Sequence, residues 1–326
     1  MLKKNNILRT KLHQPPVRDD HVHRVKLIDM LNNNYQKTAL TLVCAPAGYG
    51  KSYLVSCWLN VINIPFSWIS LDENDNDIHT FMEYLTASLE NLFPGKLANT
   101  VNLLSTIDTP PIHEITNTLI NELDEIDKEF ILVLDDYYYI RQPEIHKLIS
   151  GLLRYPPDNM HLCIITRKDP PLKIGFLRAY NRMNEIRMRE LSFNSEEVPV
   201  LYKNMLGFEV DEEISERLVE ITEGWVTGLR LTALSVNSPE QLKKLINKMN
   251  GDSRLVTEYL IEEVLSTLPE EFQRYLFNTS VLNRFCADLL DEIGEAGNRN
   301  MKSALRGNDF IKWLENMNLF LIPLDV

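Results

Sequence analysis

Residues 38–52 read Thr38-Ala-Leu-Thr-Leu-Val-Cys44-Ala45-Pro-Ala-Gly48-Tyr-Gly50-Lys51-Ser52, and this stretch decides the fold. Its first part, Thr38 to Cys44, is a short apolar run rich in strand formers, which predicts a strand buried on both faces. A Pro/Gly turn follows, and a helix is predicted from about Lys51 to Asn60. A glycine-rich turn between a strand and a helix is the context of a P-loop, and only Ala45 departs from the pattern GxxxxGK[ST].

The residue types in this loop suit a phosphate group. Gly48 and Gly50 allow the backbone to curl so that successive N–H groups point at phosphate oxygens, and the helix beginning near Lys51 adds its positive end. Lys51 is predicted to reach the β- and γ-phosphates, and the Ser52 hydroxyl to bind Mg²⁺. The alternative is a glycine-rich turn with a surface lysine, which the surrounding strand and helix disfavour.

A second motif, Phe130-Ile-Leu-Val-Leu-Asp135-Asp136, is an apolar strand that ends in two carboxylates, as a Walker B strand does. Successive side chains of a strand face opposite ways, so the two carboxylates have different tasks if the strand continues through both. Asp135 is assigned to the Mg²⁺ shell and Asp136 to positioning the attacking water. The alternative is two carboxylates in a solvated turn.

Arg167 follows a third apolar run, His161 to Thr166. Ligands of open α/β sheets bind at the carboxyl ends of the strands, so Arg167 is placed to contact the γ-phosphate and to distinguish ATP from ADP. A surface arginine is the alternative.

The chain is organised as alternating strands and helices followed by helices alone. Further runs at Phe66 to Leu71 and Pro143 to Leu153 predict a strand and a helix, and such alternation indicates a parallel, doubly wound sheet. After about Glu190 helical periodicity dominates, and Ser195 with two glutamates behind it suggests a helix start. We expect a P-loop nucleotide-binding domain over 1–192, a helical domain over 193–266 and a third domain over 267–326.

Composition excludes several classes of protein. Lys and Arg number 34 and Asp and Glu 46, for a net charge of −12, which disfavours nucleic acid as the partner of this chain. No apolar run approaches the ~20 residues that span a bilayer, and the amino terminus is not a signal peptide. The four cysteines lack zinc-site spacing, which predicts reduced, buried thiols in a cytoplasmic protein.

These motifs together resemble the nucleotide-binding module of the STAND ATPases, specifically the amino-terminal part of the large LuxR-class transcriptional activators. The resemblance covers nearly the whole chain and rests on the following residues: Arg24 and Leu27, the loop from Ala45 to Ser52, Trp68-Ile-Ser-Leu-Asp72-Glu-Asn-Asp-Asn-Asp77, Leu134-Asp-Asp-Tyr137, Arg167, Gly224-Trp225 and Leu268-Pro-Glu-Glu271.

The resemblance implies a helical domain after residue 193 and a winged-helix domain from about 268. It implies ATP or ADP with Mg²⁺ as ligands, an ADP-bound resting state and self-association in the ATP state. Family members continue into a superhelical sensor and a helix-turn-helix, so DNA and inducer are expected only through regions downstream of this chain, which resembles a fragment. The nucleotide contacts that it implies come from Arg24, Ala47, Gly48, Tyr49, Gly50, Lys51, Ser52, Tyr53 and Trp225.

Three positions depart from the family pattern. Tyr138 stands where family members usually carry a histidine. Tyr180 replaces a common arginine, which leaves Arg178 as the expected contact to a neighbouring subunit. Val226 replaces a proline that touches the nucleotide in related modules, and packing by Trp225 would take over that contact, or Trp225 is simply part of the core.

Two charged stretches are interpreted as solvated. The acidic turn Asp72 to Asp77 lacks the bidentate Glu and central Gly of an EF-hand and is predicted to be a solvated turn near the nucleotide. The basic stretch, Arg178, Arg182, Arg187 and Arg189, is predicted to form a solvated face.

Three classes of function remain open. The first is a nucleotide-driven signalling switch that hydrolyses ATP to reset itself. The second is a stand-alone P-loop ATPase or kinase with turnover as its purpose, against which no acceptor-site motif is found. The third is a DNA-binding module acting through a winged helix, which the acidic charge disfavours.

Overall fold

The computed structural model describes residues 7–17, 21–106, 110–248, 268–282, 284–296 and 306–317. The chain divides into two compact units. The first comprises Met1–Ala45 and Gly50–Leu191, and the second comprises Pro46–Tyr49 and Ser192–Val326. The predicted boundary between residues 266 and 267 lies outside the described residues.

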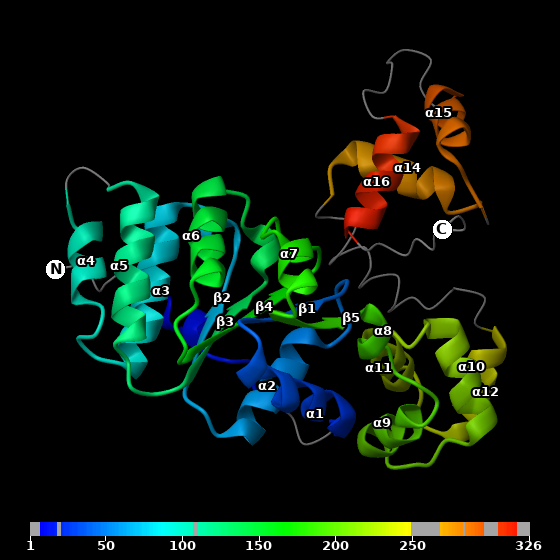
Figure 1. Cartoon of the computed structure of the whole chain (residues 1–326). Helices are drawn as coiled ribbons and strands as arrows, with labels where there is room; N and C mark the ends of the chain where they lie inside the picture. The colour runs from blue at the N-terminus through cyan, green and yellow to red at the C-terminus, as the bar shows by residue number, and fades with distance from the viewer. Residues whose placement is uncertain are drawn as a thin grey trace. The chain divides into compact units, whose positions relative to one another are not determined.

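A parallel five-stranded sheet forms the centre of the first unit (Figure 1). Its order is β2-β3-β4-β1-β5, so β4 lies between β1 and β3. Because all pairings are parallel, the carboxyl ends of the strands meet at one edge of the sheet. The strands are β1 (Leu40–Cys44), β2 (Phe66–Ser70), β3 (Phe130–Asp135), β4 (Met160–Thr166) and β5 (Met183–Arg187).

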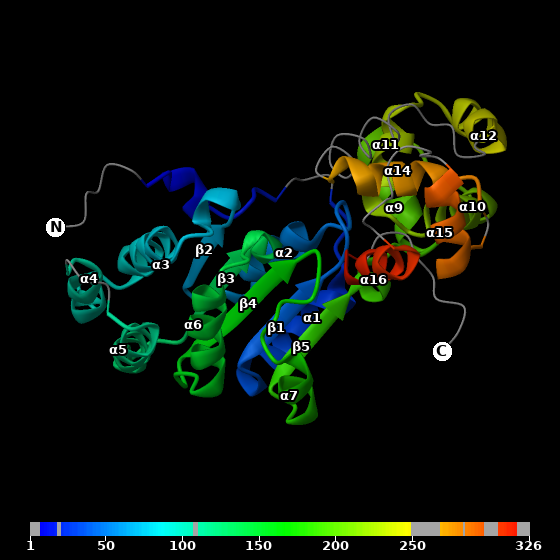
Figure 2. The ribbon, with the colours of Figure 1, turned by 90° about the horizontal axis from the view of Figure 1, so that it is seen from above.

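Helices cover both faces of this sheet, which confirms the predicted doubly wound α/β class (Figures 1 and 2). On one face lie α1 (Val25–Asn34) and α2 (Lys51–Ile62). The opposite face carries α3 (Ile78–Leu92), α4 (Ala98–Leu104), α5 (Ile112–Asp124), α6 (Pro143–Arg154) and α7 (Ile174–Ala179). Short helices complete the unit: η1 (Arg9–Leu12), η2 (Tyr35–Lys37), η3 (Glu73–Asp75), η4 (Tyr137–Tyr139) and α8 (Met188–Leu191).

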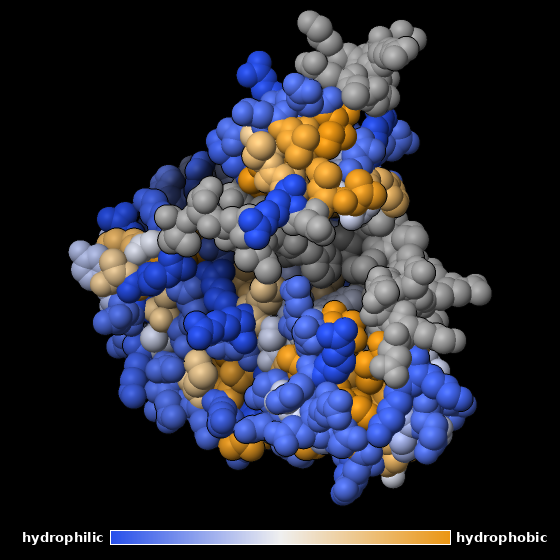
Figure 3. Space-filling view, turned by 90° about the vertical axis from the view of Figure 1, so that its right-hand side faces the viewer, coloured by the Kyte–Doolittle hydropathy of each residue, from blue (hydrophilic) through white to orange (hydrophobic). Residues whose placement is uncertain are grey.

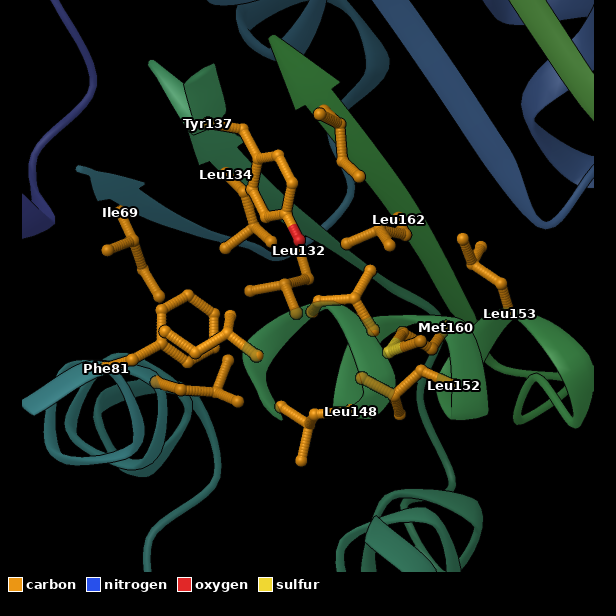
Figure 4. Close-up of a cluster of buried hydrophobic side chains, with 14 of the residues drawn as sticks. Ile69, Phe81, Leu132, Leu134, Tyr137, Leu148, Leu152, Leu153, Met160 and Leu162 are labelled. Carbon is orange, nitrogen blue, oxygen red and sulfur yellow. The ribbon is translucent and has the colours of Figure 1, made fainter. Parts of the chain in front are cut away.

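The larger hydrophobic core lies between the sheet and the α3–α7 layer. Leu132 and Leu134 of β3 point into it, where they meet Phe81 of α3 and Leu148 of α6 (Figure 4). All four side chains are fully buried. Burial of such a side chain contributes about 1.5–3 kcal/mol, so this layer stabilises the position of β3 in the sheet.

The two solvated interpretations hold only in part, because most residues of both stretches are exposed or half-buried but Asp75 and Arg187 form ion pairs. Asp75 in the acidic turn is fully buried and forms an ion pair with Lys11 of η1. Arg187 ends the edge strand β5, where its guanidinium binds the carboxylates of Asp169 and Glu185. Lys11 lies 64 residues before Asp75, and Asp169 lies 18 residues before Arg187, so neither of these partners is indicated by the local sequence.

The cysteine prediction holds only in part. Cys44 and Cys163 are buried, whereas Cys57 is half-buried and Cys286 is exposed.

The second unit is helical. It contains α9 (Glu197–Leu206), α10 (Glu212–Thr222), α11 (Val226–Leu234) and α12 (Pro239–Lys248). Ser195 was the predicted start of α9, but the Asn194 side chain accepts hydrogen bonds from the N–H groups of Glu196 and Glu197 instead, each at 3.0 Å. An asparagine oxygen reaches the first free N–H groups of a helix as well as a serine does.

Three further helices belong to this unit: α14 (Glu270–Thr279), α15 (Ala287–Ala296) and α16 (Gly307–Met317). They share a small core of Tyr275, Leu290, Phe310 and Leu314. Apolar surface is also visible over this part of the chain in Figure 3, and its exposed side chains include Phe277 and Val281. No helix within the described ranges is long and apolar enough to cross a membrane.

Candidate functional site

The P-loop depends on two glycines with left-handed backbone conformations. Gly48 has φ 78° and Gly50 φ 76°, values that only glycine adopts without strain. Gly50 is the residue before α2, so α2 begins at Lys51 directly after the turn. A Cβ at Gly48 would lie 2.5 Å from the Trp225 Nε1 and 2.7 Å from the Thr227 Oγ1, so this position also has no room for a side chain.

Lys51 is a buried lysine, only 7% exposed, at the start of α2. Burial and the nearby positive charge of Arg167 lower the pKa of Lys51 to about 8, while Asp136 and Asp135 act in the opposite direction. The ammonium group therefore stands in a place that penalises a positive charge. An anion bound beside Lys51 and Arg167 would relieve that penalty.

Asp135 ends β3 and is 4% exposed. Its Oδ1 accepts hydrogen bonds from the Ser52 hydroxyl and from the Asp136 N–H, both at 2.9 Å. Burial, followed by the negative charge of Asp136, raises the pKa of Asp135. The hydroxyl and the carboxylate predicted to bind Mg²⁺ are thus adjacent.

Asp136 does not continue the strand. It has a left-handed backbone conformation, with φ 55° and ψ 37°, and η4 begins at the next residue. The argument that alternation along a strand separates the two carboxylates therefore does not apply. Instead, the change of backbone conformation separates them.

Arg167 follows β4, the strand between β1 and β3. The strand order therefore places Arg167 between the P-loop strand and the carboxylate strand. Its guanidinium lies over the ring of Tyr138, 4.6 Å from the centroid, which is a cation–π contact. Sequence reasoning noted Tyr138 only as a departure from the family pattern, and no local signal indicated this contact.

The apex of the P-loop belongs to the second unit, together with the start of α11. The Trp225 indole N–H donates to the Ala47 carbonyl at 3.0 Å. The hydroxyl and the backbone N–H of Thr227 both donate to the Gly48 carbonyl, at 2.9 Å and 3.2 Å. Thr227 was not predicted as a site residue, since nothing in its neighbourhood marks a threonine at a helix start as functional.

The remaining predicted nucleotide contacts lie on the first unit. The Arg24 guanidinium donates to the carbonyls of Leu191 and Glu190, at 2.6 Å and 3.1 Å. The Tyr53 ring on α2 is 6.1 Å from the His21 ring. Their roles toward a nucleotide stay predictions.

The donor set fits a nucleotide with Mg²⁺. Within the described residues, no cluster of three or more His, Cys, Asp or Glu side chains could hold a metal ion. Mg²⁺ commonly needs only one or two protein ligands, because phosphates and water complete its shell. Ser52 and Asp135 supply such a pair, and Lys51 with Arg167 supplies the cations for phosphate.

Comparison with known proteins shows which regulators the chain is similar to. The family model described as the MalT winged helix domain matches residues 261–326. The HTH-type transcriptional regulators MalT of Yersinia enterocolitica and Yersinia pestis are each 30% identical over 98% of this chain. The chain spans about a third, 34%, of the length of these curated relatives.

Among solved structures, a Walker-type ATPase of Pyrococcus abyssi matches the fold with a TM-score of 0.57. It is 16% identical, and the match covers 94% of this chain and 93% of that chain. At this identity the likeness concerns the fold alone.

The parallel sheet, the glycine-rich loop and the strand that ends in Asp135 define the P-loop nucleotide-binding fold. Similarity to the curated regulators over nearly the whole chain, with the winged-helix match at its end, makes it a MalT-like module.

Proposed function

We propose that this chain is the ATP-binding and ATP-hydrolysing switch of a cytoplasmic transcriptional regulator, with an ADP-bound resting state and ATP-driven multimerisation. One observation carries the proposal. Two cations, Lys51 and Arg167, and two carboxylates, Asp135 and Asp136, meet at the carboxyl edge of one sheet, close enough for the charge of Arg167 to lower the pKa of Lys51 and that of Asp136 to raise the pKa of Asp135. A bound phosphate group would offset the repulsion between the two cations, and Mg²⁺ would offset the repulsion between the two carboxylates.

Each residue then has a separate task. Lys51 and Arg167 bind phosphate oxygens, and the N–H groups of residues 47–52 complete the phosphate cradle. Ser52 and Asp135 hold Mg²⁺, which neutralises phosphate charge when bound. Asp136 orients the attacking water. Arg24, Tyr53 and Trp225 remain the proposed further contributors from the family resemblance.

The regulatory part of the proposal rests on the curated relatives, which are named as transcriptional regulators. We propose the three-domain division at residues 192 and 266, with 267–326 as the winged-helix domain. DNA and inducer would act through parts of a longer regulator beyond these residues.

Titration calorimetry with ADP, ATP and a non-hydrolysable ATP analogue, each with and without Mg²⁺, tests the proposal. Wild-type protein should bind all three, and Lys51→Ala should abolish binding because it removes the P-loop cation. Lys147→Ala is the control, since Lys147 is an exposed lysine paired only with Glu144 of its own helix. Unchanged affinity in Lys51→Ala would refute the site. Rapid turnover with no nucleotide-dependent change in assembly would favour the stand-alone enzyme instead.

A further inference from the structure

Three hydrogen bonds connect the start of α11 to the carbonyl groups at the apex of the P-loop. The Trp225 indole binds the Ala47 carbonyl, and Thr227 binds the Gly48 carbonyl with both its hydroxyl and its N–H. The loop apex and α11 lie in the same compact unit. We propose that Thr227 and Trp225 are positioning residues that aim the phosphate-binding N–H groups of the loop through its backbone.

The argument starts from the geometry of the peptide bond. In a trans peptide the C=O and the following N–H point in opposite directions. Fixing the Ala47 carbonyl toward Trp225 therefore turns the Gly48 N–H to the other side, and fixing the Gly48 carbonyl toward Thr227 does the same for the Tyr49 N–H. Those two N–H groups belong to the stretch that a P-loop offers to phosphate.

The α11 side of the contact is itself held in place. Trp225 is 6% exposed, and its N–H donates to the Thr222 carbonyl at 2.9 Å. Gly224 has φ 71°, and its carbonyl accepts the Phe193 N–H at 2.8 Å. A Cβ at Gly224 would lie 2.4 Å from the Phe193 oxygen, so the turn before α11 excludes any side chain. The donors thus reach the loop from a rigid turn.

Helix α11 supplies an N–H that would otherwise lack a partner. The first N–H groups of a helix have no acceptor within the helix, and Thr227 is the second residue of α11. Its N–H is 3.2 Å from the Gly48 oxygen. A change in the conformation of the loop apex would therefore break contacts on α11, which makes these hydrogen bonds a physical link between the loop apex and α11.

The inference rests on the proposed function and is tested by the ADP affinity of four variants. Thr227→Val keeps the shape of threonine but loses the hydroxyl, and Trp225→Phe loses the indole N–H. Each should weaken ADP binding about three- to tenfold, the effect of one hydrogen bond. Thr227→Ser restores the hydroxyl and should restore the affinity.

Thr232→Val is the matched control. The Thr232 hydroxyl donates to the Gly228 carbonyl at 2.8 Å within the same helix, so this variant loses the same kind of bond away from the loop. It should lower the melting temperature but leave ADP affinity unchanged. Binding measured by calorimetry and melting measured without ligand separate the two effects. If Thr227→Val does not fold, Trp225→Phe and Thr227→Ser carry the same comparison.

Two outcomes count against the inference, and they differ in what they overturn. Wild-type protein that binds no ADP would overturn the proposed function and this inference with it. Wild-type protein that binds ADP, while Thr227→Val and Trp225→Phe bind it as tightly as Thr232→Val, would overturn the positioning role alone.

Discussion

Asp135 and Asp136 are adjacent in sequence but differ in backbone conformation, and this difference allows them to have different tasks. Asp135 is the last strand residue, and its carboxylate accepts a hydrogen bond from the Ser52 hydroxyl. Asp136 lies beyond the strand in a left-handed backbone conformation. We expect Asp136→Asn to keep ATP bound while hydrolysis falls by about 100-fold or more, because a carboxylate held against the attacking water contributes a factor of this order. Asparagine tolerates the left-handed conformation, so the backbone should not change.

Asp135→Asn should act on the metal instead. It should weaken the Mg²⁺ dependence of nucleotide binding, because an amide replaces a charged ligand. Single-turnover hydrolysis and calorimetry over a Mg²⁺ series measure both effects. Identical Mg²⁺ profiles for the two variants would show that the roles are not separated.

Tyr138 holds the Arg167 guanidinium over its ring. A cation–π contact is worth about 0.5–2 kcal/mol, so we expect Tyr138→Leu to reduce ATP hydrolysis about 2- to 30-fold with a smaller change in ADP affinity. Tyr138→Phe keeps the ring and should retain most of the activity. Tyr139→Leu removes the neighbouring ring and is the control. Equal losses in Tyr138→Phe and Tyr138→Leu would assign the effect to the hydroxyl rather than to the ring.

At the scale of elements, a buried ion pair connects η1 to the turn that follows β2. Lys11 of η1 forms an ion pair with Asp75, which is 0% exposed, and its Nζ lies 3.1 Å from the Asp72 Oδ2. The same Nζ stands over the Tyr84 ring, 4.5 Å from its centroid. The amino-terminal segment is thus tied to the turn between β2 and α3.

Removing Lys11 leaves the Asp75 charge buried without its counter-ion. We expect Lys11→Met to lower the free energy of unfolding by about 3–5 kcal/mol, measured by urea denaturation. Lys147→Met removes a lysine from an exposed ion pair with Glu144 and should cost less than about 1 kcal/mol. The double variant Lys11→Met with Asp75→Leu should recover much of the loss. Similar losses in both single variants would contradict the buried-charge explanation.

At the scale of the whole molecule, nucleotide binding should appear as added stability. A ligand at 100 times its Kd stabilises the folded state by about 2.7 kcal/mol. We therefore expect ADP to co-purify with the protein, to exchange slowly and to raise the melting temperature. Purified protein that carries no nucleotide and shows no thermal shift with ADP would contradict this expectation.

Assembly should depend on which nucleotide is bound. We expect a monomer with ADP and only weak assembly with a non-hydrolysable ATP analogue when no inducer acts, because ATP alone shifts the two states only by its own differential affinity for them. Light scattering measures both conditions. Stable rings or dimers in ADP would contradict the resting state.

Much of the fold could be predicted because the residue pattern that marks each of these strands and helices lies within one short segment. The buried strands β1, β3 and β4 are continuous apolar runs, and the helix that follows the P-loop begins at Lys51 as expected. The edge strand β5 was missed because only alternate residues of it are buried, among arginines that suggested a solvated face. In the structure this segment is a strand because it pairs with β1, and nearby carboxylates neutralise the charge of Arg187.

The sequence by itself determined that there is a P-loop, since its glycines, Lys51 and Ser52 form one short segment directly between a strand and a helix. Only the tertiary structure decided what surrounds that loop. The strand order brings Arg167 between β1 and β3, the fold places Lys11 against Asp75, and the second unit presents Thr227 to the Gly48 carbonyl. Each of these contacts joins residues far apart in the chain, and the periodicity of one segment contains no information about which distant segment will pack against it.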